Sequence, residues 1–284
     1  MRWTPSGRGN VDDLRGQSAG GMGRVPMGIG GILVLLVLSW FTGIDFLSLI
    51  GNNPAPQTQS TGTPGEVASS PAEEQTVLFV NAVMEDTQQT WEKLLGSRYQ
   101  RTRAGIFRDA VQSACGTADS AVGPFYCPGD RKVYLDLSFF NELQSRFGAP
   151  GDFAQAYVLA HEVGHHVQTI TGIESQVRQR QAQGGDRNAL SVRMELQADC
   201  YAGVWGYHAN QGGRFQQGKI ELDPDDLEEG LRAASAIGDD TIQKRSTGRV
   251  MPDKFTHGSS AQRVDWFKRG FTTGDPNACN TFQS

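Results

Sequence analysis

The feature that most restricts the fold of this 284-residue chain is a pair of histidines four residues apart, His161 and His165, with Glu162 next to the first. The flanking residues predict a helix that begins at Asp152, because apolar side chains recur at helical spacing and Gly172 follows as a C-terminal cap. Residues four apart share one face of a helix, so both imidazoles can reach one metal ion. The pattern H-E-x-x-H predicts a zinc site in which the glutamate faces a water without ligating the metal.

The alternative is a pair of histidines exposed on a helix surface. The neighbours Ala160, Val163 and Gly164 are small or apolar, which indicates that this face is buried. Burying two histidines and a glutamate without an ion or a partner would be costly. We therefore expect Zn²⁺ as the cofactor.

A catalytic zinc site needs a third protein ligand and an open fourth position. The remaining candidates are acidic residues and the histidines His166, His208 and His257. A helix predicted from about Ala189 to Ala209 carries Glu195 and Asp199 one turn apart. We assign Glu195 as the third ligand and Asp199 as the acceptor of a hydrogen bond from the far nitrogen of a ligating histidine. The alternative is a solvated acidic helix face.

An uncharged and mostly apolar run from Val25 to Ile44 is long enough to cross a membrane as a helix. Arginines precede it, and the first Lys or Arg after it is Lys93, which predicts a cytoplasmic N-terminus and an extracytoplasmic remainder. We expect a retained signal-anchor in the inner cell membrane, because the run is long for the apolar part of a signal peptide and no clear cleavage site follows it. The alternative is a cleaved signal peptide. The predicted division is a cytoplasmic segment at 1–24, a transmembrane helix at 25–45, a disordered linker at 46–75 and a folded domain at 76–284.

The folded domain is expected to be of the α+β class, mostly helical with a small β-hairpin. The hairpin strands are predicted at Pro124–Cys127 and Lys132–Leu137, with a Pro-Gly-Asp turn between them. Helices are expected from Thr76, over Ser138–Phe147, from Asp152, over Ala189–Ala209, from Asp223 toward Gln243, and from Ser259 or Ser260.

Four cysteines, an even number, fit two disulfides in an oxidising compartment. The expected pairs are Cys115–Cys127, which would staple the hairpin, and Cys200–Cys279, which would tie the Glu195 helix to the C-terminus; the connectivity stays open. Four buried thiols are the alternative if the domain faces the cytoplasm. No C-x-x-C pair is present, which argues against a structural zinc knuckle.

The charge pattern argues against nucleic-acid binding. The formal net charge is −5, and the isoelectric point is near 5.6. The basic residues form no stripe with interleaved aromatic residues, so we expect no nucleic-acid partner.

Several stretches carry a family resemblance. They are RWTPSGRGNVDDLRG (Arg2–Gly16), SACG (Ser113–Gly116), GPFYCPGDRKVYLDLSFF (Gly123–Phe140), GDFAQAYVLAHEVGHHVQ (Gly151–Gln168), RMELQADCYAGVW (Arg193–Trp205) and FTHGSSAQRVDWF (Phe255–Phe267). Through them the chain resembles the putative neutral zinc metallopeptidase family of bacterial membrane proteins. The H-E-x-x-H helix followed by an E-x-x-x-D helix is similar to the gluzincin arrangement. The resemblance implies a zincin-like metallopeptidase domain, bound zinc and a peptide or protein substrate.

The sequence Phe255-Thr-His257, with Arg263 six residues after the histidine, also resembles a C-terminal motif of the CaaX-type membrane zinc proteases. That resemblance implies that His257 donates to the developing oxyanion and that Arg263 orients the site or binds substrate. A structural hydrogen bond at the start of a helix is the alternative for His257.

Together these features predict a membrane-anchored zinc metallopeptidase in which Glu162 is the general base. The alternative is a zinc-stabilised envelope protein of the same fold that binds or scaffolds without turnover. The strand Lys132–Leu137 is expected to pair with an extended substrate as an edge strand.

Overall fold

The computed structural model describes residues 1–16, 69–211 and 220–283. Its main sheet has the strand order β1-β2-β6-β5. The strands are β1 (Val11–Asp13), β2 (Arg103–Phe107), β5 (Phe125–Cys127) and β6 (Lys132–Asp136), and a separate hairpin pairs β3 (Ala110–Ser113) with β4 (Gly116–Asp119). The pairs β1–β2 and β2–β6 are parallel, and only β5 runs antiparallel to its neighbour β6.

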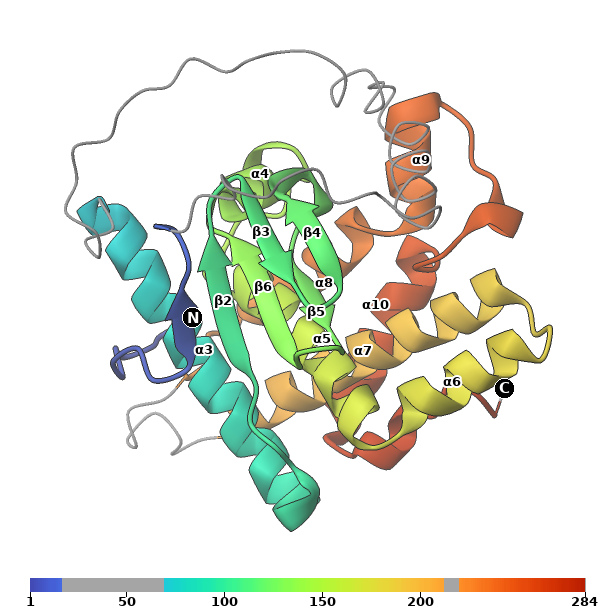
Figure 1. The fold of residues 1–284 in the computed structure, drawn as a ribbon, viewed down its shortest axis with the longest axis horizontal. Helices are drawn as coiled ribbons and strands as arrows, with labels where there is room; N and C mark the ends of the chain where they lie inside the picture. Colours follow the sequence, from blue (N-terminus) through green and yellow to red (C-terminus); the bar gives the residue numbers. More distant parts are fainter. Residues whose placement is uncertain (17–68, 212–219, 284) are drawn as a thin grey trace.

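Helices make up most of the described chain. They are α3 (Pro71–Leu95), α4 (Ser138–Ser145), α5 (Asp152–Ile170), α6 (Ile173–Ala182), α7 (Arg187–Ala209), α8 (Asp226–Ala236), α9 (Asp239–Thr247) and α10 (Ser260–Thr273). Helices α3 and α5 pack against the sheet, while α7, α8 and α10 pack together with α5 (Figure 1). The helix α5 therefore lies between the sheet and the helices α7 and α8, and most of its residues are buried.

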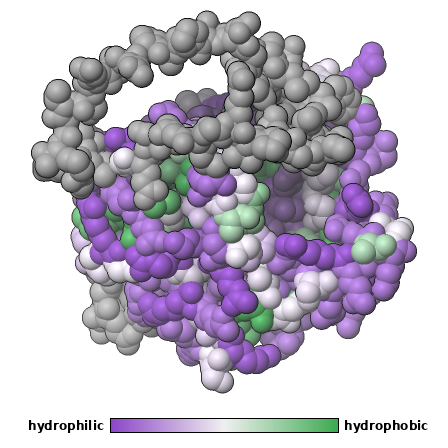
Figure 2. Space-filling view, viewed as in Figure 1, coloured by the Kyte–Doolittle hydropathy of each residue, from purple (hydrophilic) through white to green (hydrophobic). Residues whose placement is uncertain are grey.

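The core is continuous from the sheet to the C-terminal helices. Phe153 on α5 stacks on Trp205 of α7, with 5.7 Å between ring centroids, and also contacts Phe267 of α10. Such burial of large apolar side chains is the main favourable term in folding. On the face shown in Figure 2, by contrast, the described residues are mainly hydrophilic.

The local predictions for the hairpin and for most helices are confirmed. The strands β5 and β6 pair antiparallel, and helices lie over Asp152–Ile170 and Arg187–Ala209. The helix expected from Thr76 begins earlier, at Pro71, where Ser70 forms a capping box with Glu73. The single helix expected from Asp223 toward Gln243 is two helices, α8 and α9, because the chain turns at residues 237–238.

The predicted fold class is wrong. The sequence predicted an α+β domain with a hairpin, preceded by an anchor and a linker. The structure instead has a mixed α/β fold with parallel strands. The reason is that residues 1–16 do not stand apart from the domain: β1 pairs with β2, and Arg2 forms an antiparallel bridge with Glu221. Parallel pairing joins segments that are distant in sequence, and no local pattern announces it.

The predicted transmembrane helix at 25–45 and most of the linker at 46–75 lie outside the described residues. No helix within residues 1–16, 69–211 and 220–283 combines the length and the apolar character needed to cross a membrane.

Asn10 anchors the N-terminal segment through a buried amide network. Its backbone N–H donates to Asn81 Oδ1 over 2.9 Å, and its own side-chain oxygen accepts from Gln88 Nε2 over 2.9 Å. Gln88 Oε1 in turn accepts from the backbone N–H of Thr102 over 2.7 Å. All four side chains are buried, so the network joins β1 to α3 and to the start of β2.

We expect Asn10→Leu to destabilise the protein by about 1–3 kcal/mol for each buried polar group that loses its partner. Thermal unfolding of the full chain measures the effect. Asn141→Leu, on the exposed face of α4, is the matched control and should change the free energy of unfolding by no more than about 0.5 kcal/mol. Equal melting temperatures for Asn10→Leu and wild type would show that the segment is not part of the cooperative fold.

Candidate metal centre

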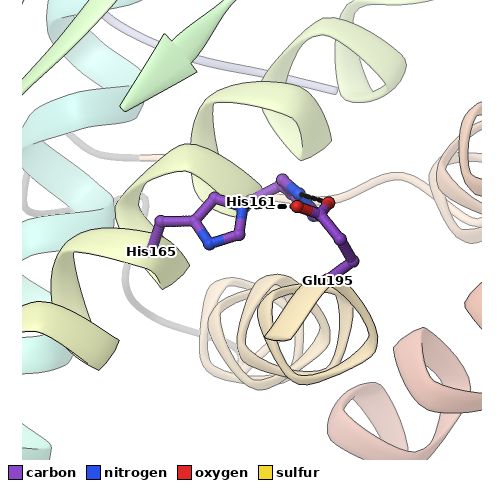
Figure 3. A group of neighbouring side chains, drawn as sticks. All are labelled: His161, His165 and Glu195. Atoms are coloured by element: carbon purple, nitrogen blue, oxygen red, sulfur yellow. Dashed lines mark hydrogen bonds and ion pairs between the residues drawn. The ribbon is translucent and has the colours of Figure 1, made fainter. Parts of the chain in front are cut away.

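Three predicted ligands meet at the contact of α5 with α7. His161 Nε2 lies 3.2 Å from one carboxylate oxygen of Glu195, and His165 Nε2 lies 3.5 Å from the other. Figure 3 shows the Glu195 carboxylate pointing toward the two rings. The imidazoles come from successive turns of α5, with 4.8 Å between ring centroids. The spacing read from the sequence thus places both rings and the carboxylate around one point.

The donor set fits a zinc ion. Each of the three residues offers one ligand atom, a ring nitrogen or a carboxylate oxygen, and these three atoms lie within 4.8 Å of one another. In a tetrahedral site with bonds of about 2.0–2.1 Å, ligand atoms lie roughly 3.3 Å apart, close to the separations observed here. Two nitrogens and one carboxylate oxygen are also ligands that zinc prefers in catalytic sites.

The packing of α5 on α7 permits this approach. A Cβ atom on Gly164, between the two histidine turns, would lie 3.1 Å from the Cα and the carbonyl oxygen of Ala198. That distance is shorter than ordinary van der Waals contact, so a side chain at Gly164 would push the helices apart. Small residues at this contact hold the Glu195 side of α7 near the histidines.

Asp199 supports His161 from behind. Its Oδ1 lies 2.9 Å from His161 Nδ1, which leaves Nε2 directed at Glu195. The same carboxylate accepts from Arg263 Nε and Nη2 over 2.9 and 2.8 Å and from the Tyr157 hydroxyl over 2.5 Å. Arg263, expected to orient the site or bind substrate, therefore pairs with the group that orients His161.

Buried charge makes this cluster favourable for a cation. Burial opposes protonation of His161, but the carboxylates of Asp199 and Glu195 outweigh it and raise the pKa of His161 to about 10. Burial likewise opposes ionisation of Glu195, yet the facing histidines hold its pKa well below the usual range. An anionic carboxylate opposite two imidazoles is a site that attracts positive charge.

His165 is supported by an amide instead of a carboxylate. Its Nδ1 lies 2.8 Å from Gln168 Oε1, one turn further along α5. Gln168 is fully buried. The residue was missed at the sequence level, although its position three residues after His165 on the helix is a usable signal.

Glu162 is 8% exposed and lines the cavity beside the ligands. Burial raises the pKa of its carboxyl group, which favours its action as a proton acceptor near neutral pH. Within the described part of the chain, its carboxylate accepts no hydrogen bond from another residue. The side chain is thus available to a reactant in the cavity.

His257 reaches the same cavity from the loop before α10. Its Nδ1 lies 3.3 Å from Asp239 Oδ1, and the Asp239 carboxylate also accepts from the backbone N–H groups of Thr256, His257 and Gly258 over 2.7, 2.7 and 3.0 Å. Partial burial of the ring opposes protonation, but the carboxylates of Glu195 and Asp239 raise the pKa of His257. Asp239, missed at the sequence level, therefore holds the ring through Nδ1, and no described residue makes a hydrogen bond to Nε2.

The other two candidate histidines lie elsewhere. His166 is fully buried and joins the Tyr126 hydroxyl, 3.1 Å from Nδ1, to the Gln100 carbonyl, 2.5 Å from Nε2. His208 Nε2 lies 3.0 Å from the carbonyl oxygen of Gly274. Their contacts are structural, which agrees with the expectation for His166.

The cavity in front of the ligands has a volume of about 570 Å³. Part of its lining is apolar, and this part is called the apolar wall here; it includes Val122, Phe125, Phe139, Met194, Ile237 and Ile242. The strand β5 borders it through Phe125 and Tyr126, and β5 is the last strand of the sheet as described. The prediction that Lys132–Leu137 is an edge strand is wrong, because β6 is paired on both sides, with β2 and β5.

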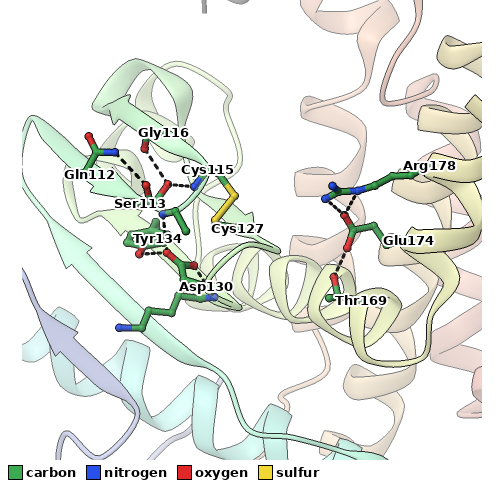
Figure 4. Close-up of a disulfide and its surroundings, with 12 residues drawn as sticks. Gln112, Ser113, Cys115, Gly116, Cys127, Asp130, Tyr134, Thr169, Glu174 and Arg178 are labelled. Carbon is green, nitrogen blue, oxygen red and sulfur yellow. Dashed lines mark hydrogen bonds and ion pairs between the residues drawn. A yellow bond between two sulfur atoms is a disulfide. The ribbon is translucent and has the colours of Figure 1, made fainter. Parts of the chain in front are cut away.

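Both expected disulfides are present. Cys115–Cys127 joins the loop of the β3–β4 hairpin to the end of β5, next to the cavity (Figure 4), and Cys200–Cys279 joins α7 to the C-terminal segment. No cysteine is left free. Figure 4 also shows Glu174, which lines the cavity but is paired with Arg178 and accepts from Thr169 Oγ1 over 2.7 Å.

Comparison with known proteins identifies relatives over nearly the whole chain. The sequence model of the family described as "Putative neutral zinc metallopeptidase" matches residues 1–282. "Uncharacterized protein YpfJ" of Escherichia coli (strain K12) is 48% identical over 298 aligned residues, covering 99% of each chain. "Uncharacterized protein Mb2605" of Mycobacterium bovis is 48% identical over 198 residues, which cover 68% of this chain and 66% of its own. No solved structure matches the chain.

We expect Glu195→Gln to weaken zinc binding by at least about tenfold, because a neutral amide oxygen is a poorer ligand than a carboxylate. Competition with a chromophoric chelator measures the affinity. The control is Glu174→Gln, a carboxylate of the same cavity that is paired with Arg178 and should bind zinc like wild type. Unchanged affinity in Glu195→Gln would remove this residue from the ligand set.

Proposed function

We propose that this chain, which belongs to the putative neutral zinc metallopeptidase family, hydrolyses peptide bonds with Glu162 as general base. The observation that carries the proposal is that the buried Glu162 carboxylate, which accepts no hydrogen bond from the described residues, lines the same cavity as the cluster of His161, His165 and Glu195. A purely structural zinc site needs no such base. The geometry therefore favours turnover over the alternative of a non-catalytic zinc-stabilised binding protein.

His161, His165 and Glu195 would hold the zinc through Nε2, Nε2 and a carboxylate oxygen. When bound, zinc acts as a Lewis acid that polarises a carbonyl group and lowers the pKa of water. Glu162 takes the proton of the attacking water at its carboxylate and passes it to the nitrogen of the leaving amine. Asp199 and Gln168 hold the two imidazoles in orientation through their Nδ1 atoms.

His257 would stabilise the charge that develops on the carbonyl oxygen of the scissile bond. The ring lines the cavity with 51% of its side chain exposed, and Asp239 holds its Nδ1. The carboxylate partner stabilises a protonated ring, so Nε2 can donate a hydrogen bond to an oxyanion. Arg263 would act indirectly, because its guanidinium donates to Asp199, which in turn holds His161.

The strand β5 is the element best placed to bind an extended peptide. It is the final strand of the described sheet and borders the cavity, and an edge strand offers backbone donors and acceptors to a substrate. The apolar wall, which includes Val122, Phe139 and Ile242, favours a bulky apolar side chain next to the scissile bond. We accordingly propose peptides or proteins with such a residue as substrates.

Two disulfides support a site of action in an oxidising compartment outside the cytoplasm. Because residues 1–16 contribute β1 to the same sheet, they would share that compartment with the catalytic cluster.

Glu162→Gln should retain zinc and lose at least about 10²-fold in hydrolysis, since the amide cannot accept the proton. A peptide-library digest and metal analysis of the same preparation measure the two properties. Removing zinc from wild type with a chelator should abolish cleavage, and adding zinc should restore it. Wild-type protein that binds zinc but cleaves nothing would instead support the non-catalytic binding protein.

The apolar wall predicts a change in selectivity for Val122→Asp. A charge on this wall should lower kcat/KM for substrates with a bulky apolar residue by roughly tenfold or more, because that side chain loses an apolar contact. Val250→Asp is the matched control: the two valines are similarly exposed, at 42% and 43%, and Val250 does not line the cavity. Identical cleavage profiles for both variants would place the specificity elsewhere.

A further inference from the structure

We propose that Gln168 and Gln197 are positioning residues that fix the tautomer and orientation of His165 through a buried relay ending at the Cys279 carbonyl. The proposal rests on the proposed zinc peptidase function, because it concerns how one zinc ligand is held. It adds two residues and the C-terminal segment to the machinery of the site.

The relay is continuous. Gln168 Oε1 lies 2.8 Å from His165 Nδ1, and Gln168 Nε2 donates to the Met194 carbonyl over 2.7 Å and to Gln197 Oε1 over 3.1 Å. Gln197 Nε2 then donates to the Cys279 carbonyl over 2.9 Å. Gln168 is 0% exposed and Gln197 is 3% exposed, so water is a poor substitute for any of these partners.

The direction of the relay follows from the chemistry of its ends. A backbone carbonyl only accepts, so the Met194 and Cys279 oxygens both require the NH₂ group of a glutamine. With its NH₂ group committed, Gln168 can offer only its oxygen to His165. The neutral ring must therefore carry its proton on Nδ1, which leaves the lone pair on Nε2 for the metal.

The two zinc ligands on α5 thus receive different support. His161 donates to Asp199, a carboxylate whose charge is balanced by Arg263. His165 donates to a neutral amide, which orients the ring without adding negative charge near Glu162. A neutral partner for His165 fits a site in which the carboxylate of Glu162 must remain able to accept a proton.

The C-terminal segment holds the far end of the relay. Cys279 ends the short 3-10 helix Pro276–Cys279 and is bonded to Cys200 on α7. Thr281 Oγ1 donates to the Arg193 carbonyl over 2.7 Å. The disulfide and this hydrogen bond attach the segment to α7 at Cys200 and Arg193, and Gln197 lies between these two residues in the sequence. Zinc affinity should consequently depend on the Cys200–Cys279 bond.

The test measures zinc affinity of the full-length protein by chelator competition, together with the melting temperature of the zinc-free form. We expect Gln168→Leu to weaken zinc binding by roughly 10–100-fold, the usual cost of losing the partner of a ligating histidine. Gln197→Leu, one step removed, should weaken it by a smaller factor. Gln88→Leu deletes an equally buried amide in the Asn10 network on α3 and should lower the melting temperature but leave zinc affinity unchanged.

The disulfide arm uses a matched pair. Replacing both Cys200 and Cys279 by alanine should weaken zinc binding, whereas replacing Cys115 and Cys127 should not, because that bond has no connection to the relay. In ¹⁵N-labelled, zinc-loaded protein the slowly exchanging Nδ1–H proton of His165 should be visible, and it should shift in Gln197→Leu although that residue does not touch the ring.

The outcomes separate the two proposals. Wild-type protein without zinc would overturn the proposed function itself. If wild-type protein binds zinc and both Gln168→Leu and Gln197→Leu bind it with the same affinity, the relay is overturned and the proposed function is not affected. If Gln168→Leu fails to fold, Gln197→Leu decides: an unchanged affinity and an unshifted proton contradict the relay.

Discussion

One buried carboxylate joins the three helices that form the site. Asp199, on α7, is fully buried and bonds to Tyr157 and His161 of α5 and to Arg263 of α10. An isolated buried charge would be prohibitive, so the cluster is stable only when all partners are in place. Arg263 supplies the balancing charge from outside the motif, so the buried carboxylate that contacts His161 depends on the packing of the C-terminal helix α10. The orientation of His161 and the packing of the helical layer therefore depend on the same carboxylate.

The sequence predicted the parts of the site that local periodicity determines. A spacing of four residues placed His161 and His165 on one face, and the same spacing paired Glu195 with Asp199 on α7. That these side chains lie together required one long-range assumption, namely that the two helices are adjacent. The absence of a side chain at Gly164 permits that contact. The fold class failed for the opposite reason. The parallel neighbours β1, β2 and β6 come from segments far apart in the chain, and neither hydropathy nor turn chemistry reveals which strands lie side by side.

The same distinction explains the errors in detail. Whether a strand is an edge depends on its neighbours, so the alternation in Lys132–Asp136 described a strand correctly but could not reveal that β2 covers its other side. Polar residues that support a functional side chain also give little signal in the sequence. Helical spacing alone could have related Gln168 to His165, but no local pattern relates Asp239 to His257. An aspartate or a glutamine on a helix is most often solvated, so neither residue was singled out from the sequence.

The position of these supports relative to the ligands has a physical consequence. The candidate ligands come from the two adjacent helices α5 and α7, and Asp199 and Gln168, which hold the two imidazoles, lie on the same helices. These two residues are held in turn by Arg263 of α10 and, through Gln197, by the C-terminal segment, while the sheet that borders the cavity is completed by residues near the N-terminus. Orientation of a ligand within a fraction of an ångström requires that its partner be rigidly held as well. A short helix carrying H-E-x-x-H can bring two imidazoles together by itself, yet the acceptors that set their tautomers must themselves be held by other parts of the fold. Setting the tautomers needs acceptors fixed by tertiary structure, which explains why so much of this chain outside the motif is packed around it.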